Sequence, residues 1–159
     1  MKTNKTYLIV GNGKLAKHLR FFLQSQNIRV QTWARKTHTP QQLQDLHKTL
    51  DYTLICISDS ALPTFITENS LALEKCIHFS GALHVPGALS YHPLMTFSDN
   101  LYPLDFYTTI PLVGIKGQPQ VINVLPFSNN PYYEIEADQK GLYHALCVLG
   151  GNFTNLLWS

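Results

Sequence analysis

The first 80 residues alternate short apolar runs with segments of helical spacing, and no other feature constrains the fold as strongly. The apolar, β-rich runs cover residues 6–10, 28–33, 52–58 and 75–79. The segments between them favour helices over residues 15–26, 40–50 and 61–73. This β-α-β-α-β-α-β order predicts an α/β fold built on a doubly wound, mostly parallel sheet.

Beyond residue 80 the pattern is weaker. Residues 80–108 are rich in Gly, Pro, His, Tyr and Ser, and they predict loops around one or two short strands. The elements expected after them are a strand over 109–115, a short helix over 119–125, an edge strand over 132–136 and a long apolar helix over 140–158.

A glycine-rich turn, GNGKLA, joins the first strand to the first helix. Gly11 allows the tight turn, Gly13 lets a pyrophosphate approach the backbone, and Ala16 permits close packing of helix on strand. The free N–H groups of the helix would bind the anion. A Rossmann-type dinucleotide site is therefore predicted, although a structural turn or another nucleotide-like ligand, such as a methyl donor, fits the same pattern. The candidate ligand-binding residues are Gly11, Asn12, Gly13, Lys14, Leu15 and Ala16.

The end of the second strand favours NADP over NAD. NAD sites place an acidic residue there for the ribose 2′-hydroxyl, but no carboxylate precedes Asp45. The position is held by Arg35, Lys36 and Thr37, which can bind a 2′-phosphate through a guanidinium, an ammonium and a hydroxyl. The alternative is that Arg35 and Lys36 are ordinary solvated loop charges.

The charge distribution agrees with a site for a small polyanion. The net charge is only +2, but residues 1–44 contain eight Lys and Arg and no acidic residue. Such a basic segment could bind nucleic acid. Because the aromatic interleaving of a stacking surface is absent, we expect no nucleic-acid partner.

Composition limits the class of protein further. The apolar runs are too short for a membrane span or for the core of a signal peptide, so we expect a cytoplasmic protein that binds no membrane. Cys56, Cys76 and Cys147 each lie in an apolar run, which indicates free thiols and no disulfide. No metal-binding pattern is found, and no metal is expected.

Several motifs together resemble one known family. They are GNGKLA, ARK, ISDSALP, HFSGAL, SYHPLMTF and KGLYHALCVLGGN, which are spread over nearly the whole chain. They resemble a Rossmann-like NADP oxidoreductase family of poorly defined function, related to pyrroline-5-carboxylate reductases, deazaflavin-linked NADP reductases and the phosphogluconate and hydroxyacid dehydrogenases. The resemblance implies an NADP-binding Rossmann domain over residues 1–138. Residues 139–159 would begin the all-helical domain that mediates dimerisation in that family.

The turn after the third strand should border the cofactor, because ligands bind at the carboxyl ends of parallel strands. The residues concerned are Ile57, Ser58, Asp59 and Ser60, and Gly81 follows the fourth strand in the same way. The alternative is that Asp59 or Ser60 is only the N-cap of the next helix.

The fourth strand ends at His78 and Ser80, a position that faces the nicotinamide end of a dinucleotide. His92 lies in a loop that can return to the same crevice. A histidine can supply or accept the proton that accompanies hydride transfer. Each of these residues is also compatible with a purely structural role.

Lys140, His144 and Asn152 complete the candidate catalytic set on the last helix. Lys140 and His144 share one face, and Asn152 lies within about 120° of it. The related hydroxyacid dehydrogenases carry a Lys and an Asn four residues apart on the corresponding helix, whereas this chain has His144 there. The alternatives are a surface charge for Lys140 and an interhelical polar contact for Asn152.

These observations predict an NADP-dependent oxidoreductase that transfers a hydride to or from a small carbonyl, imine or hydroxy compound. The alternative is a non-catalytic NADP(H)-binding sensor or assembly module. Because the last helix is apolar over more than one stripe, we also expect a homodimer formed through it.

Overall fold

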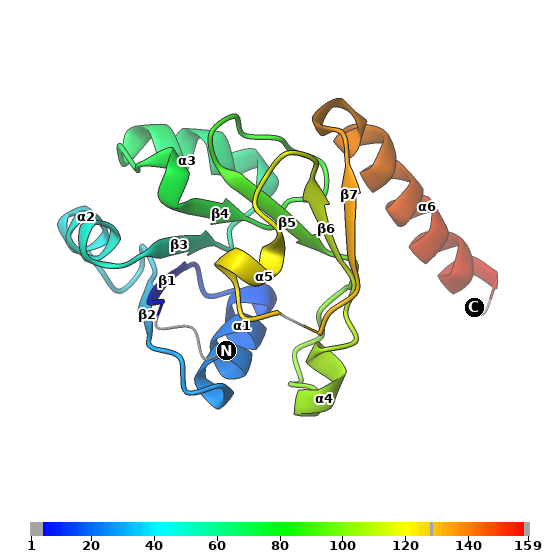
Figure 1. The fold of residues 1–159 in the computed structure, drawn as a ribbon, viewed down its shortest axis with the longest axis horizontal. Helices are drawn as coiled ribbons and strands as arrows, with labels where there is room; N and C mark the ends of the chain where they lie inside the picture. Colours follow the sequence, from blue (N-terminus) through cyan, green and yellow to red (C-terminus); the bar gives the residue numbers. More distant parts are fainter. Residues whose placement is uncertain (1–4, 128, 158–159) are drawn as a thin grey trace.

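The computed structural model describes residues 5–127 and 129–157, with side chains described up to residue 151. Its centre is a seven-stranded sheet in the order β2-β1-β3-β4-β5-β6-β7 (Figure 1). All neighbouring strands are parallel except the antiparallel pair β5–β6. The strands are β1 (Tyr7–Val10), β2 (Val30–Trp33), β3 (Tyr52–Ile55), β4 (Cys76–His78), β5 (Leu89–Pro93), β6 (Leu112–Ile115) and β7 (Tyr132–Ile135). The predicted α/β, mostly parallel sheet is confirmed.

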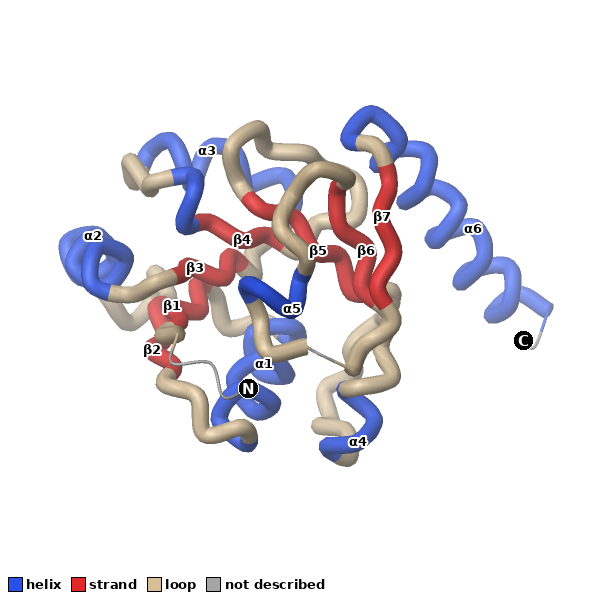
Figure 2. Tube along the Cα trace, in the orientation of Figure 1, coloured by secondary structure: helices blue, strands red, loops and turns tan. Residues whose placement is uncertain are grey.

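Helices cover both faces of the sheet and one of its edges (Figure 2). The α-helices are α1 (Lys14–Ser25), α2 (Pro40–Thr49), α3 (Leu62–Glu68), α4 (Leu104–Tyr107), α5 (Val121–Val124) and α6 (Lys140–Leu157). Short 3-10 turns are η1 (Asp59–Ala61), η2 (Leu73–Lys75) and η3 (Ala137–Gln139). Among the described residues, no helix combines the length and the apolarity that crossing a membrane requires.

The alternation of side chains along β1 explains why the sheet is covered on both faces. Tyr7 and Ile9 point into the cluster beneath α1, α4 and α5, while Leu8 and Val10 point into the cluster beneath α2 and α3. All four side chains are fully buried. A strand that is apolar throughout is therefore required at this position.

The helix predicted over residues 61–73 is shorter in the structure. It ends at Glu68, and Ser70 takes a positive φ of 47°. A residue in this left-handed conformation cannot continue a right-handed helix. Two strand predictions were also too long, because β3 ends at Ile55 and β6 begins only at Leu112.

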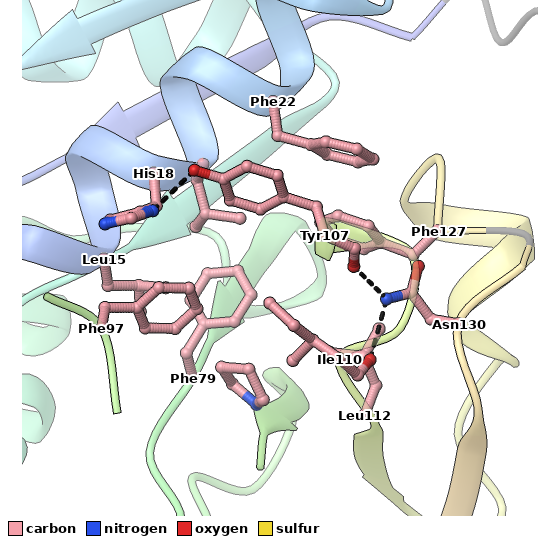
Figure 3. A pocket seen from close by; sticks show the side chains of 12 residues that line it. Leu15, His18, Phe22, Phe79, Phe97, Tyr107, Ile110, Leu112, Phe127 and Asn130 are labelled. Carbon is pink, nitrogen blue, oxygen red and sulfur yellow. Dashed lines mark hydrogen bonds between the residues drawn. The ribbon is translucent and has the colours of Figure 1, made fainter. Parts of the chain in front are cut away.

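The core beneath α1 contains a small apolar hollow of about 30 Å³ (Figure 3). His18 borders it and is itself buried, with Nδ1 2.7 Å from the Tyr107 hydroxyl and Nε2 3.0 Å from the Ser98 carbonyl oxygen. Ligand pockets are typically roughly 300–1,000 Å³. This hollow therefore belongs to the packing of the core.

The long helix α6 lies along β7, beyond the edge of the sheet (Figures 1 and 2). Its first residue is buried against the strand ends, but one of its faces is open. Leu142, Leu146 and Leu149, spaced four and three residues apart, are 67%, 59% and 59% exposed. Such spacing places them on one stripe of the helix.

Candidate functional site

The strand order places a crevice at the carboxyl ends of β1 and β3. The connections that follow β1 and β3, through α1 and α3, lead to opposite sides of the sheet there, which is where ligands bind in open α/β folds. The structure has a hollow of about 270 Å³ at this point, which we call the coenzyme groove. Its walls include Gly11, Asn12, Gly13, Arg35, Lys36, Cys56, Ile57, Ser58 and Phe65.

Two glycines of the GNGKLA turn have different roles. Gly11 has φ = +111°, and a Cβ there would lie 2.4 Å from the carbonyl oxygen of Cys56, so the fold itself requires glycine. Gly13 is the N-cap of α1, and a Cβ there would meet no atom within 4 Å. The open space at Gly13 lies at a helix N-terminus, where free N–H groups favour an anion.

The turn after β2 carries the positive charges of the groove. Arg35 and Lys36 are exposed, and neither forms an ion pair with a carboxylate of the described residues. Thr37 instead lines a neighbouring hollow of about 330 Å³, together with Lys17 and Arg20. The structure therefore divides the predicted Arg35–Lys36–Thr37 set between two adjoining hollows.

The first turn of α1 connects the groove with a further hollow. Lys14 is held in an exposed ion pair, with its Nζ 3.2 Å from the carboxylate of Asp99. Leu15 lines a second hollow of about 200 Å³, which we call the inner pocket, and Ala16 is buried against the sheet. Cys56 and Ile57 lie in the walls of both the groove and the inner pocket, so the two hollows adjoin.

A hydrogen bond of Asp59 links the segment after β3 to the segment after β4, beside the inner pocket. The Oδ2 of Asp59 accepts a hydrogen bond of 2.7 Å from the hydroxyl of Ser80. The interpretation of Asp59 or Ser60 as the cap of the next helix is wrong, because the N-cap of α3 is Ala61 and no side chain caps it. Ser60 lies 3.4 Å from Ser58, hydroxyl to hydroxyl.

His78 lies in the wall of the inner pocket and is fully buried. Neither ring nitrogen has a hydrogen-bond partner among the described residues. Burial, reinforced by the charge of Lys140, lowers the pKa of His78 to about 3. The ring is therefore neutral near pH 7.

Lys140 is buried, with 3% of its surface exposed, so the interpretation as a surface charge is wrong. Its Nζ donates to the carbonyl oxygen of Ser80 at 2.7 Å and to the hydroxyl of Ser90 at 2.6 Å. Burial lowers the pKa of Lys140 to about 8. These bonds tie the start of α6 to the segment that follows β4 and to the beginning of β5.

Two histidines meet above Gly81. The rings of His92 and His144 pack edge to face with centroids 5.8 Å apart. A Cβ on Gly81 would lie 2.9 Å from His92 Nε2 and 2.4 Å from His144 Nδ1. His92 Nδ1 lies 2.8 Å from the hydroxyl of Tyr143, and burial lowers the pKa of His92 to about 4.

A larger hollow of about 540 Å³ opens between this histidine pair and α6, and we call it the α6 cleft. Its lining residues are His92, Leu94, Met95, Thr96, His144, Cys147, Val148 and Gly151. The side chain of Asn152 lies outside the described residues. Among the described residues, no group of three His, Cys, Asp or Glu could hold a metal ion.

The candidate catalytic residues whose side chains are described therefore cluster at the ends of β4 and β5 and the start of α6. Sequence reasoning missed Tyr143 and Ser90, which contact His92 and Lys140. It also missed Phe65 in the groove and Met95 in the cleft. Tyr143 directly precedes the candidate residue His144, and this neighbouring aromatic hydroxyl could have identified Tyr143 from the sequence.

No family model and no curated protein matches the chain. Solved structures share its fold. A candidate NADP oxidoreductase from Bacteroides fragilis is 19% identical, with a TM-score of 0.68 over 98% of this chain and 70% of the other. An imine reductase variant from Myxococcus stipitatus, in complex with NAD+, is 15% identical, with a TM-score of 0.67 over 98% of this chain and 64% of the other.

An NADH-preferring ketol-acid reductoisomerase from an uncultured archaeon is 13% identical, with a TM-score of 0.68 over 96% of this chain and 59% of the other. The chain thus spans between 59% and 70% of the lengths of these three proteins. At such low identities the likeness establishes a shared Rossmann-like fold. The resemblance to one particular family remains a prediction.

Proposed function

We propose that the chain is an NADP-dependent oxidoreductase acting on a small carbonyl, imine or hydroxy compound. One observation carries the proposal: the coenzyme groove leads through the inner pocket to the strand end where Ser80 and Gly81 meet the His92–His144 pair. The neighbours named as oxidoreductases support the same class. A site with this layout can hold a dinucleotide at one end and a substrate at the other.

The residues present fit the coenzyme. The pyrophosphate would lie at Gly13 on the N-terminus of α1, and Arg35 with Lys36 would hold the 2′-phosphate. Leu15 and Asp59 would border the nicotinamide end in the inner pocket. When bound, a nicotinamide coenzyme supplies or accepts a hydride, while the protein provides orientation and the accompanying proton.

The histidine pair relays the proton in this proposal, giving it up from one ring nitrogen and regaining it at the other, because the His92 ring is neutral near pH 7. Its rings adjoin the α6 cleft, and the Tyr143 hydroxyl fixes the orientation of His92. Lys140 acts as a positioning residue, because both of its described partners are structural groups. Asp59 likewise positions the Ser80 hydroxyl.

We predict that NADPH binds more tightly than NADH and that Arg35→Ala removes most of the difference. The loss of a charge-assisted, two-point contact should cost roughly 1.5–3 kcal/mol of NADPH binding free energy. The NADH affinity should not change. Titration of both coenzymes against both proteins measures the effect.

Asp45→Ala is the matched control, since this exposed residue lies on α2 outside the groove lining. Equal affinities of the unmodified protein for NADH and NADPH would contradict the assignment of the 2′-phosphate to this turn.

Gly81→Ala should reduce turnover while leaving NADPH binding intact. The new methyl group must displace the histidine rings that lie 2.4 and 2.9 Å from its position. A shift of about 1 Å in a positioned catalytic group can lower the rate by about 100-fold. Gly141→Ala, where a Cβ would meet no atom within 4 Å, is the control.

A screen of carbonyl, imine and hydroxy compounds with NADPH or NADP+ tests the proposed activity itself. The alternative, a non-catalytic NADP(H)-binding module, is favoured by the buried structural use of Lys140. NADPH binding without turnover on any compound class would select that alternative.

We further propose that α6 begins a helical dimerisation element after an α/β domain of residues 1–138. The open stripe of Leu142, Leu146 and Leu149 would pack on a second copy. Sedimentation at micromolar concentration should give a dimer, and Leu146→Glu should convert it to a monomer. A stable monomer of the unmodified chain would oppose this proposal.

A further inference from the structure

We infer that the α6 cleft selects an uncharged substrate, a neutral ketone, aldehyde or imine with an apolar substituent, and rejects carboxylates at the same position. The inference rests on the proposed oxidoreductase function, which it makes more specific. The inference depends on which charged side chains lie around the cleft and on the hydrogen bonds that these side chains already form.

The described residues that line the cleft offer hydrogen-bonding groups and apolar walls but include no Lys or Arg. Its described walls combine the rings of His92 and His144 with the apolar side chains of Leu94, Met95 and Val148. Burial, together with the nearby Lys140 and His144, keeps the pKa of His92 at about 4, so that this ring is neutral near pH 7. Residues 141–159 contain no Lys, Arg, Asp or Glu at all.

The ammonium group of Lys140, which acts electrostatically on His92, is not among the described lining residues and is already hydrogen-bonded. Lys140 is buried, and its Nζ is 2.7 Å from the Ser80 carbonyl oxygen and 2.6 Å from the Ser90 hydroxyl. The carboxylate of Asp59 also acts on His92 electrostatically, and it opposes the effect of Lys140. A substrate carboxylate in the cleft would therefore lose hydration without contacting a Lys or Arg side chain of the described lining residues.

A neutral carbonyl or imine meets a favourable environment instead. Its oxygen or nitrogen can accept a hydrogen bond from the histidine pair, and its substituent can pack on Leu94, Met95 or Val148. Reduction then adds the hydride from NADPH to the carbon and a proton, relayed from water through the histidine pair, to the oxygen or nitrogen, giving an alcohol or an amine and NADP+. The selectivity arises because an unpaired buried charge is far more costly than a neutral group that is hydrogen-bonded.

Matched pairs of 2-oxo acids and their methyl esters test this inference, because each pair differs mainly in charge. We expect kcat/KM with NADPH to be at least about tenfold higher for the ester. Val148→Lys, at a position 45% exposed, should raise the value for the acid and narrow the ratio at least about tenfold. Ile122→Lys on α5, at a position 52% exposed and outside the cleft, should leave the ratio unchanged.

Ligand-observed NMR can measure the binding of the same pairs to the NADP+-saturated protein. This measurement tests the charge selectivity of the cleft separately from the oxidoreductase function. Tighter binding of esters without turnover would support the selectivity of the cleft while opposing the oxidoreductase function. Acids that bind or react as well as their esters would overturn the inference, as would a Val148→Lys variant with an unchanged ratio. Failure of both acids and esters to bind would also overturn it.

Discussion

Gly13→Val should abolish dinucleotide binding in a protein that still folds, raising the Kd for NADPH by at least about 100-fold. Gly13 is the N-cap of α1 with φ = −73° and ψ = −174°, a conformation that valine can adopt. No described atom lies within 4 Å of a Cβ at this position, so the isopropyl group would extend into open space. In the proposed coenzyme complex, the pyrophosphate approaches the helix N-terminus through that space.

Gly11→Ala is the comparison variant, because it should affect the stability of the fold and not primarily the binding of the dinucleotide. There φ is +111° and a Cβ would lie 2.4 Å from the Cys56 carbonyl oxygen. We expect it to lower the free energy of unfolding by roughly 2–4 kcal/mol, because the strained backbone and the clash act together. Coenzyme titration and chemical denaturation of both variants separate the two roles. Unchanged NADPH binding in a well-folded Gly13→Val protein would show that the turn is only structural.

The strand–helix alternation could be predicted because it depends on local patterns. The run at Tyr7–Val10 must be apolar throughout to fill clusters on both faces of the sheet, and the sequence carries that signal directly. The end of α3 was harder to predict from the sequence. Nothing in the local pattern shows that Ser70 adopts a left-handed conformation and stops the helix.

The residues of the site were less predictable than the fold, because their roles depend on contacts distant in sequence. Its position in the first turn of a helix suggests that Lys140 is a surface charge. In the structure it is buried and bonded to Ser80 and Ser90, which lie 60 and 50 residues earlier. Asp59 has the local position of a helix cap, but the Ser80 hydroxyl, 21 residues later, binds its carboxylate. The pairing of β3 with β4 brings Asp59 to Ser80, and the position of the start of α6 brings Lys140 to Ser80 and Ser90.

The buried histidines should make the stability of the protein fall in mild acid. In the folded state the pKa of His78 is about 3, below the ordinary value of 6.5, because burial and the charge of Lys140 and His84 disfavour the imidazolium. The unfolded chain takes up the proton below about pH 6.5, and the folded chain does not do so until about pH 3. The stability contributed by the neutral ring is therefore fully present above the unfolded pKa and is lost as the pH falls toward the folded pKa.

Chemical denaturation between pH 7 and about pH 4.5 should accordingly show a loss of about 2–3 kcal/mol attributable to His78, since each pKa unit corresponds to about 1.4 kcal/mol. His78→Phe places a ring of similar size at this position and cannot titrate. Over the same pH range, the unfolding free energy of this variant should therefore fall by about 2–3 kcal/mol less than that of the unmodified protein. His84→Gln removes an exposed histidine whose charge makes the smallest of the three contributions to the lowered pKa of His78, so it should change the slope much less than His78→Phe does. Because carboxylates contribute equally to all three proteins, the difference in slope isolates His78. Parallel slopes for His78→Phe and the unmodified protein would mean that the folded state accepts a proton on this ring, and that the inner pocket is more hydrated than its packing indicates.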